Sequence, residues 1–293
     1  MFHKEKKSFE IKKFHNETSS FRAKKSLGQN FLKSEPALKK MCEAGEVNDK
    51  DIILEIGPGK GALTTKLLAI SKKVLAVEKD RELFEFLKEK FADEIKSGKF
   101  EIINEDILEI NVKDYNLKKG DYKIIANIPY NITGAIFKKF LSSQDQPKTM
   151  VLLVQKEVAE RIVAKPAKGG TGAGKESILS LSVKAYGTPK YIMKVAKRFF
   201  SPAPKVDSAI IAIYDISKNN FIGEVSENNF FSVVKSGFAH KRKVLRKNLE
   251  ILQKTPLQID NIFEKLKIDP KARAEDIKFD NWIKISEFLF KKD

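Results

Sequence analysis

The sequence predicts an α/β protein in which a largely parallel sheet precedes a small domain made only of helices. Between Ile52 and Tyr214, short runs rich in Ile, Val and Leu alternate with longer amphipathic stretches, the pattern of strands joined by crossover helices. After about Ser217 the apolar residues fall at helical spacing, and no run of strand type recurs. These two patterns together define the predicted fold class.

Each expected strand is nearly continuous in apolar residues, which indicates a sheet buried on both faces. The predicted strands are 52–56, 73–78, 100–104, 122–127, 149–155, 191–196 and 208–214. The helices predicted between them are 62–70, 81–91, 133–141, 156–164 and 176–185. Beyond the sheet, helical spacing occurs over 230–238, 244–252, 259–266 and 280–290.

The chain is basic, with 56 Lys and Arg against 39 Asp and Glu in 293 residues and a net charge of +17. We predict a flexible basic tail over residues 1–20, an α/β domain over 21–217 and a helical RNA-binding domain over 218–293. The tail suits contact with nucleic acid, although a solvated leader that only aids solubility fits its charge as well. No stretch of about 20 uninterrupted apolar residues occurs, so we expect no membrane span.

The sequence offers little material for a metal site or a disulfide. Cys42 is the single cysteine, and the histidines are His3, His15 and His240. We therefore predict no internal disulfide and no zinc site. The first 20 residues lack the apolar core of a secretory signal. A reducing compartment, and hence the cytoplasm, is the predicted location.

A glycine-rich stretch over 165–177 is predicted to be a flexible surface loop. Within it Gly169, Gly174 and Lys175 match most of the phosphate-binding pattern G-x-x-x-x-G-K-[ST]. The next residue is Glu176, whose carboxylate would replace the hydroxyl that holds magnesium, and no suitable strand leads into the loop. We therefore favour a loop over a nucleotide site.

The first predicted strand ends in a glycine-rich turn, with Gly57, Gly59 and Gly61 before a helix that opens at Ala62. Glycines let the backbone turn sharply there and approach a ligand closely. The residues also satisfy the dinucleotide pattern G-x-G-x-x-G/A, but Pro58 removes one amide donor that a pyrophosphate would need. A tight turn without a ligand is the alternative.

Acidic residues follow the next two predicted strands. Glu78 lies 21 residues after Gly57, where an open α/β sheet places an acid that accepts hydrogen bonds from ribose hydroxyls. Taken alone it could instead be a helix-start acid beside Lys79. Asp106 suits the exocyclic amine of an adenine, with Ile107 supplying an apolar face. Because carboxyl ends of parallel strands meet at one sheet edge, the sequence favours a nucleoside ligand.

The fourth predicted strand ends in Asn127-Ile128-Pro129-Tyr130. This motif resembles that of Rossmann-fold S-adenosylmethionine-dependent methyltransferases that act on exocyclic amines. Six segments in order are similar to the small-subunit ribosomal RNA adenine dimethyltransferases, the KsgA family, over residues 21–290. They are LGQNFL (27–32), EIGPGKGALT (55–64), NIPYNI (127–132), FFSPAPKVDSA (199–209), FAHKRKVLRKNL (238–249) and IDPKARAEDI (268–277).

The resemblance implies a Rossmann-like class I methyltransferase domain, a C-terminal helical domain and S-adenosyl-L-methionine as cofactor. It implies that Gln29, Asn30 and Leu32 close over the methionine end of the cofactor, while Glu78 holds the ribose and Asp106 the adenine. The residues expected to bind the cofactor are Gln29, Asn30, Leu32, Gly57, Gly59, Glu78, Lys79, Asp106, Ile107 and Asn127.

The chemistry of adenine methylation suits the same motif. Hydrogen-bond acceptors can draw protons from the amine as it pyramidalises, and we assign this to the side-chain oxygen of Asn127 and the backbone carbonyl of Ile128. Pro129 fixes the backbone between them and Tyr130, whose ring can stack on a base held out of any duplex. Taken alone, the motif could instead be a strand-ending turn packed by a tyrosine.

By the same resemblance, Phe200 is the second aromatic residue expected to stack on the target base. Phe199 is aromatic too, so the sequence leaves open which ring faces the base.

A basic stretch over 235–248 holds six Lys or Arg and no acid. Lys243, Arg246 and Lys247 have helical spacing, which predicts a shared face, with Lys241 and Arg242 at its start. Such a face can hold RNA phosphates without reading sequence. A solvated helix surface is the alternative, and the net charge of +17 favours RNA.

The predicted function is dimethylation of two adjacent adenosines in small-subunit ribosomal RNA, with a role in subunit biogenesis and a monomeric enzyme. Two alternatives remain: a large-subunit adenine methyltransferase of the macrolide-resistance type, and a non-catalytic assembly or transcription factor. Zinc-dependent deamination is disfavoured because the H-x-E and P-C-x-x-C pattern is missing from the sequence.

Overall fold

The computed structural model describes residues 22–164, 174–221 and 225–291. The predicted tail over 1–20 and most of the predicted glycine-rich loop lie outside these residues. The described chain forms two compact units, which we treat separately. The first unit comprises residues 22–140, 144–156 and 192–212, and the second comprises 141–143, 157–164, 174–191, 213–221 and 225–291. The predicted division at residue 217 stays a prediction.

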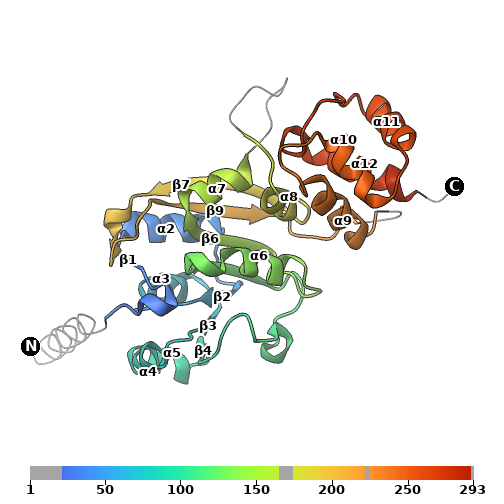
Figure 1. Ribbon diagram of the computed structural model, residues 1–293. Coiled ribbons are helices and arrows are strands. Elements are labelled where there is room, and N and C mark those ends of the chain that lie inside the picture. The colour runs from blue at the N-terminus through green and yellow to red at the C-terminus, as the bar shows by residue number, and fades with distance from the viewer. Residues whose placement is uncertain (1–21, 165–173, 222–224, 292–293) are drawn as a thin grey trace, which may run out of the picture. The chain divides into compact units, whose positions relative to one another are not determined.

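A seven-stranded sheet runs in the order β4-β3-β2-β5-β6-β9-β7 (Figure 1). Its strands are β2 (Ile52–Ile56), β3 (Lys73–Val77), β4 (Phe100–Ile103), β5 (Tyr122–Asn127), β6 (Thr149–Gln155), β7 (Thr188–Val195) and β9 (Ser208–Tyr214). All seven were predicted, four of them with the same bounds. The largest shift is in β7, which begins three residues earlier than predicted.

The strand order creates the crevice in which such sheets bind ligands. β2 pairs in parallel with β3 on one side and with β5 on the other. Strands β3 and β4 therefore follow β2 toward one edge of the sheet, and β5 and β6 follow toward the other edge. β4 and β6 extend the parallel sheet outward on the two sides. Ligands of open α/β sheets bind beyond the carboxyl ends of the strands at such a switch point.

The helices of the first unit largely match the prediction. They are α2 (Glu35–Ala44), α3 (Ala62–Ile70), α4 (Arg81–Lys90), α5 (Ala92–Lys96) and α6 (Thr133–Leu141), the last of which ends just beyond the unit. α2 and α5 were not predicted. The start of α2 carries an N-terminal signal that could have revealed it, since Ser34 caps the amide of Ala37 and a proline follows Glu35.

A second, two-stranded sheet was not predicted either. β1 (Phe31–Leu32) pairs antiparallel with β8 (Phe200–Ser201), and the amide of Lys33 donates to the carbonyl oxygen of Phe199 at 2.8 Å. Two-residue strands have no readable periodicity, and this pair joins segments about 170 residues apart. We name this pair, with Lys33 and Phe199, the β1–β8 ribbon.

The second unit contains α7 (Lys156–Val163), α8 (Ile178–Lys184), α9 (Glu227–Gly237), α10 (Leu245–Leu249), α11 (Pro256–Lys265) and α12 (Phe279–Phe290), with Lys156 itself in the first unit. The fully buried Trp282 is central to the packing of α9, α10 and α12. Its indole stacks on Phe238 with ring centroids 5.6 Å apart, and it leaves no room for a side chain at Gly237. No helix among the described residues is long and apolar enough to cross a membrane.

The turn from β2 into α3 depends on Gly61, which caps the helix with a φ of +77°. A Cβ at this position would lie 2.8 Å from a ring carbon of Phe91 and 2.9 Å from a methyl carbon of Leu87. Both the backbone conformation and the tight packing therefore require glycine.

We expect Gly61→Ala to lower the free energy of unfolding by about 2–5 kcal/mol, the sum of left-handed backbone strain and overpacking. Gly98→Ala is the matched control, because Gly98 has a φ of +76° but nothing within 4 Å of an added Cβ. The control should cost only about 1–2 kcal/mol. Urea denaturation of both variants measures the difference, and equal losses would show that packing against Phe91 and Leu87 is unimportant.

Candidate functional site

The carboxyl ends of β2, β3 and β5, with the turn after β4, open into a cavity of about 890 Å³ in the first unit. The wall includes every residue predicted to bind the cofactor: Gln29, Asn30, Leu32, Gly57, Gly59, Glu78, Lys79, Asp106, Ile107 and Asn127. The structure therefore brings together residues from five separate segments of the sequence, as the sheet topology predicts.

Glu78 lies at the centre of the polar wall of this cavity. Its carboxylate accepts a hydrogen bond from the amide of Gly59 at 3.1 Å and another from the amide of Asp80 at 2.9 Å. Burial raises the pKa of Glu78, while these two amides oppose the rise. The acid thus ties the glycine-rich turn to the start of α4 and lines the cavity between them.

Asp106 and Lys79, both predicted to bind the cofactor, form an ion pair in the structure. The ammonium nitrogen of Lys79 lies 2.8 Å from Oδ2 of Asp106 and holds the pKa of that carboxyl below its usual range. The other carboxylate oxygen accepts from the amide of Leu108 at 2.9 Å. Ile107 is buried beside it on the cavity wall. Asp106 is therefore ionised and oriented by its neighbours.

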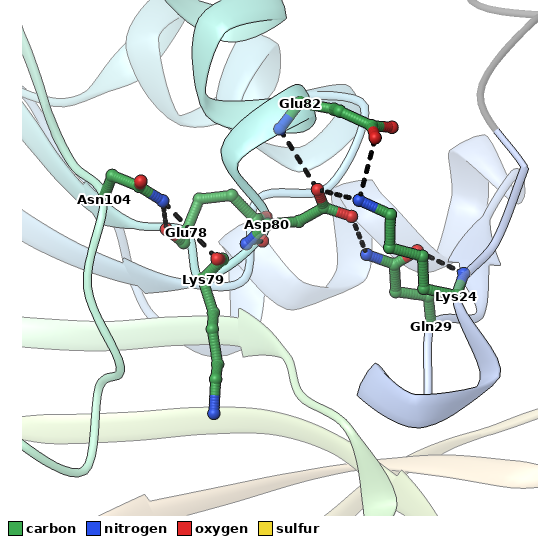
Figure 2. A network of polar contacts seen from close by, with 7 residues as sticks. All are labelled: Lys24, Gln29, Glu78, Lys79, Asp80, Glu82 and Asn104. Atoms are coloured by element: carbon green, nitrogen blue, oxygen red, sulfur yellow. Dashed lines mark hydrogen bonds and ion pairs between the residues drawn. The ribbon is translucent and has the colours of Figure 1, made fainter.

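The segment over residues 24–33, which we name the N-terminal strap, is tied to the start of α4 by a polar network (Figure 2). The ammonium of Lys24 donates to Oδ1 of Asp80 at 2.7 Å, and the side-chain amide of Gln29 donates to Oδ2 at 2.8 Å. Oε1 of Gln29 in turn accepts from the backbone amide of Lys24 at 2.8 Å. Gln29 thus holds the strap closed with its side chain while lining the cavity.

Sequence reasoning missed four members of this network: Lys24, Asp80, Glu82 and Asn104. The side-chain nitrogen of Asn104 donates to the backbone oxygen of Glu78 at 2.9 Å. Figure 2 also shows the side chain of Lys79 pointing away from Asp80. Asp80 had a readable signal, because an Asp just before a predicted helix is a common N-cap, and it does accept from the amide of Glu82. Lys24 had none, since 56 residues separate it from Asp80.

The predicted catalytic motif forms the end of β5 and the turn that follows. The side-chain nitrogen of Asn127 donates to the backbone oxygen of Asn30 at 3.0 Å, which fixes the amide against the N-terminal strap. Pro129 is extended and leads into a short 3-10 helix, Tyr130–Ile132. The hydroxyl of Tyr130 lies 2.6 Å from that of Ser208, which holds its ring in place. Asn127, Ile128, Pro129 and Tyr130 all line the cavity.

The structure does not bring Phe200 to the wall of the cavity. Phe200 is buried, at 4% exposure, and pairs with Leu32 in the β1–β8 ribbon. Phe199 is the exposed aromatic residue of the two, at 38%. The predicted stacking of Phe200 on a target base stays a prediction.

The predicted helical face in the basic stretch is wrong in one respect. α10 begins only at Leu245, because the chain over 239–243 is turned, with the amide of Lys243 donating to the carbonyl oxygen of His240 at 3.0 Å. Lys241, Arg242 and Lys243 therefore precede the helix and share no helical face with Arg246 and Lys247. This exposed cluster belongs to the second unit.

Two of the predicted RNA-binding cations already have acidic partners in the second unit. Arg246 forms a two-pronged ion pair with Asp260, and Lys247 lies 3.2 Å from a carboxylate oxygen of Glu250. Their charges are partly neutralised, so Lys241, Arg242 and Lys243 are the stronger candidates for phosphate contacts.

Glu55, within β2, is a buried acid on the cavity wall that sequence reasoning did not single out. It is 1% exposed, and its Oε2 has no hydrogen-bond partner among the described residues. Burial raises the pKa of Glu55 to about 8, and the charge of Glu78 contributes in the same direction. Glu55 therefore carries a proton at neutral pH. Within the described residues, no group of three His, Cys, Asp or Glu side chains could hold a metal ion.

Comparison with solved structures supports the fold class. The chain is similar to the 23S rRNA methyltransferase ErmE, with a TM-score of 0.69 and 23% identity over 89% of this chain and 100% of that one. It is also similar to a dimethyladenosine transferase from Plasmodium falciparum, with a TM-score of 0.70 and 24% identity over 87% of this chain and 95% of that one. The switch-point cavity and these likenesses show the Rossmann-like fold of class I methyltransferases, with a C-terminal helical part.

Sequence comparison is more specific. The family model described as ribosomal RNA adenine dimethylase matches residues 20–291. Proteins named ribosomal RNA small subunit methyltransferase A are 38% identical in Fusobacterium nucleatum, over 90% of this chain and 97% of that protein, and 38% identical in Dehalococcoides mccartyi, over 91% and 88%. The chain belongs to the ribosomal RNA adenine dimethylase family, which confirms the predicted enzyme class and cofactor.

We expect Lys24→Met to loosen the N-terminal strap and leave α4 intact, because Asp80 still caps the helix. Amide hydrogen exchange over residues 28–33 should accelerate, whereas Lys25→Met, at a lysine that does not contact Asp80, should leave it unchanged.

Burial alone would raise the pKa of Asp80, but the hydrogen bonds from Lys24 and Gln29 outweigh this effect, and the pKa lies below its usual range. The wild-type contact therefore persists down to about pH 4 and weakens below it. Unchanged exchange in Lys24→Met would refute the contact.

Glu55 should make the stability of the protein fall with rising pH. Its pKa is about 8 when folded and about 4.3 when unfolded, so the native state alone holds the proton between these values. Stability contributed by the protonated form is complete below about pH 4 and is lost as the pH rises through 8. In urea titrations, the difference in free energy of unfolding between Glu55→Gln and the wild type should change in favour of the variant as the pH rises from 5 to 9. Glu101→Gln, at a partly exposed acid paired with Lys73, should show no such trend.

Proposed function

We propose that this protein transfers methyl groups from S-adenosylmethionine to the exocyclic N6 amines of two adjacent adenosines in small-subunit ribosomal RNA, during subunit maturation. The observation that carries the proposal is the hydrogen bond from the side-chain nitrogen of Asn127 to the backbone oxygen of Asn30. Because the nitrogen donates there, the amide oxygen is the atom left to accept a hydrogen bond from an incoming amine.

The residues that line the cavity suit the cofactor by their chemistry. Buried Glu78 offers carboxylate oxygens for a ribose diol, and Asp106 offers an acceptor for an adenine amine beside the apolar side chain of Ile107. Nothing lies within 4 Å of a Cβ placed on Gly57, so the turn leaves open space for a ligand against its backbone. When bound, S-adenosylmethionine supplies a methyl group on a positively charged sulfur.

Asn127 and Ile128 act on the target amine. With the cofactor bound, the amide oxygen of Asn127 and the carbonyl oxygen of Ile128 would accept hydrogen bonds from the target amine as its nitrogen becomes tetrahedral and more acidic. The cofactor would supply the methyl group, and its bond between sulfur and methyl carbon would break to leave S-adenosylhomocysteine. The released proton then passes to solvent. The ring of Tyr130, held by the hydroxyl of Ser208 at 2.6 Å, stacks on the extruded base and orients it.

The choice of the small subunit rests on the relatives of 35–38% identity, which are named small subunit methyltransferases. The large-subunit alternative is represented by ErmE at 23% identity, a likeness that concerns the fold alone. We further propose that the protein works as a monomer. We also propose that it is located in the cytoplasm, in keeping with its single, buried cysteine.

Mass spectrometry of ribosomal RNA tests the proposed function. Purified protein incubated with isotopically labelled methyl donor and immature small subunits should give N6,N6-dimethyladenosine at two neighbouring positions. Large subunits from the same cells serve as the control substrate. Methylation confined to the large subunit would favour the macrolide-resistance type, and no methylation of either subunit would favour a non-catalytic assembly factor.

Asn127→Ala should lower turnover by at least about a hundredfold, since it removes a hydrogen-bonding group aimed at the transition state. Binding of S-adenosylhomocysteine, measured by calorimetry, should persist. Asn127→Asp is the matched variant, because it keeps an acceptor oxygen and loses the bond to Asn30, and it should retain more activity than the alanine variant. Normal turnover in Asn127→Ala would disprove the acceptor role.

A further inference from the structure

The β1–β8 ribbon borders the cavity. Phe31 and Leu32 of β1 and the following Lys33 all line it, and so does Ser201, the partner of Phe31 on β8. Phe200, the partner of Leu32, is buried at 4% exposure.

Phe199 lies next to this wall. The amide of Lys33, a wall residue, donates to the carbonyl oxygen of Phe199 at 2.8 Å, and Ser201, two residues after Phe199, lines the cavity. Phe199 ends a short 3-10 helix, Lys197–Phe199, and its side chain is 38% exposed. An exposed aromatic residue therefore adjoins the edge of the cavity.

Phe199 is accompanied by cations. The guanidinium of Arg198 lies 5.2 Å from the centroid of its ring, and the ammonium of Lys60 lies 5.1 Å from the ring of Phe31 on the neighbouring strand. Lys33 and Lys60 both line the cavity, and burial, with the charge of Lys33, lowers the pKa of Lys60. The rim thus combines an exposed aromatic ring with three positive side chains.

The acid closest in sequence to this group has other partners. Asp207 lies 2.9 Å from the ammonium of Lys194 and accepts from the backbone amide of Lys197 at 3.0 Å. Neither contact involves Arg198, whose guanidinium lies over the ring of Phe199.

We propose that Phe199, with Arg198 and Lys33, forms a stacking platform for a nucleotide adjacent to the target adenosine in unpaired RNA. The platform rests on the proposed function, because only a base inserted into the cavity brings its neighbours to this rim. An aromatic ring flanked by cations is the chemistry that binds single-stranded nucleic acid, with the ring meeting a base and the cations meeting phosphates. A target base drawn out of its stack leaves its neighbour with an unstacked face, which Phe199 covers.

Phe199→Ala tests the platform, and Phe288→Ala is a closely matched control. Phe288 lies on α12 of the second unit, is 37% exposed against 38% for Phe199, and has the ammonium of Lys265 at 5.6 Å from its ring. We expect Phe199→Ala to raise KM for immature small subunits about tenfold, with KM for S-adenosylmethionine unchanged. Phe288→Ala should leave both constants unchanged. Equal behaviour of the two variants would overturn the proposal.

A second measurement separates stacking from a merely structural role. A short unpaired RNA with two adjacent adenosines is compared with the same RNA made abasic at each flanking position in turn. For wild-type protein, Kd should rise about tenfold with one of the two abasic RNAs. For Phe199→Ala, Kd should not rise further when that abasic RNA replaces the intact one. Additive losses at both positions would overturn the platform. Failure of wild-type protein to methylate subunits while it still shows the abasic effect would overturn the proposed function alone.

Discussion

The site depends on one buried carboxylate at the carboxyl end of β3, next to the strand at which the sheet order reverses. Glu78 accepts hydrogen bonds from the amides of Gly59 and Asp80, and so connects the turn after β2 to the start of α4. A buried carboxylate without such donors would be costly, so the two turns must converge wherever the acid is buried. This convergence forms the polar wall of the cavity.

Asp80 extends the same constraint to the beginning of the described chain. It caps α4 and at the same time accepts from Lys24 and Gln29, so the N-terminal strap closes against the helix that Glu78 positions. The strap in turn provides the backbone oxygen of Asn30 that orients Asn127. The polar wall of the cavity and the side-chain amide of Asn127 are therefore linked by hydrogen bonds rather than by packing alone.

Charge is distributed differently in the two units. In the first unit the cations near the cavity either neutralise an acid, as Lys79 does for Asp106, or accompany an aromatic ring, as Arg198 does for Phe199. In the second unit the basic stretch is partly neutralised by its own acids, with Arg246 paired to Asp260. The net charge of +17 thus does not by itself indicate which cations can meet RNA phosphates.

The sequence by itself determined the seven strands, the order of the segments that line the cavity and the acids at the strand ends, because local periodicity and glycine-rich turns encode them. Only the tertiary structure decided which side chains contact one another. The bond between Lys24 and Asp80 and the pairing of β1 with β8 join residues far apart in sequence, and packing alone leaves Phe199 exposed beside the buried Phe200. Such contacts arise from the geometry of the closed chain, and no local signal carries them.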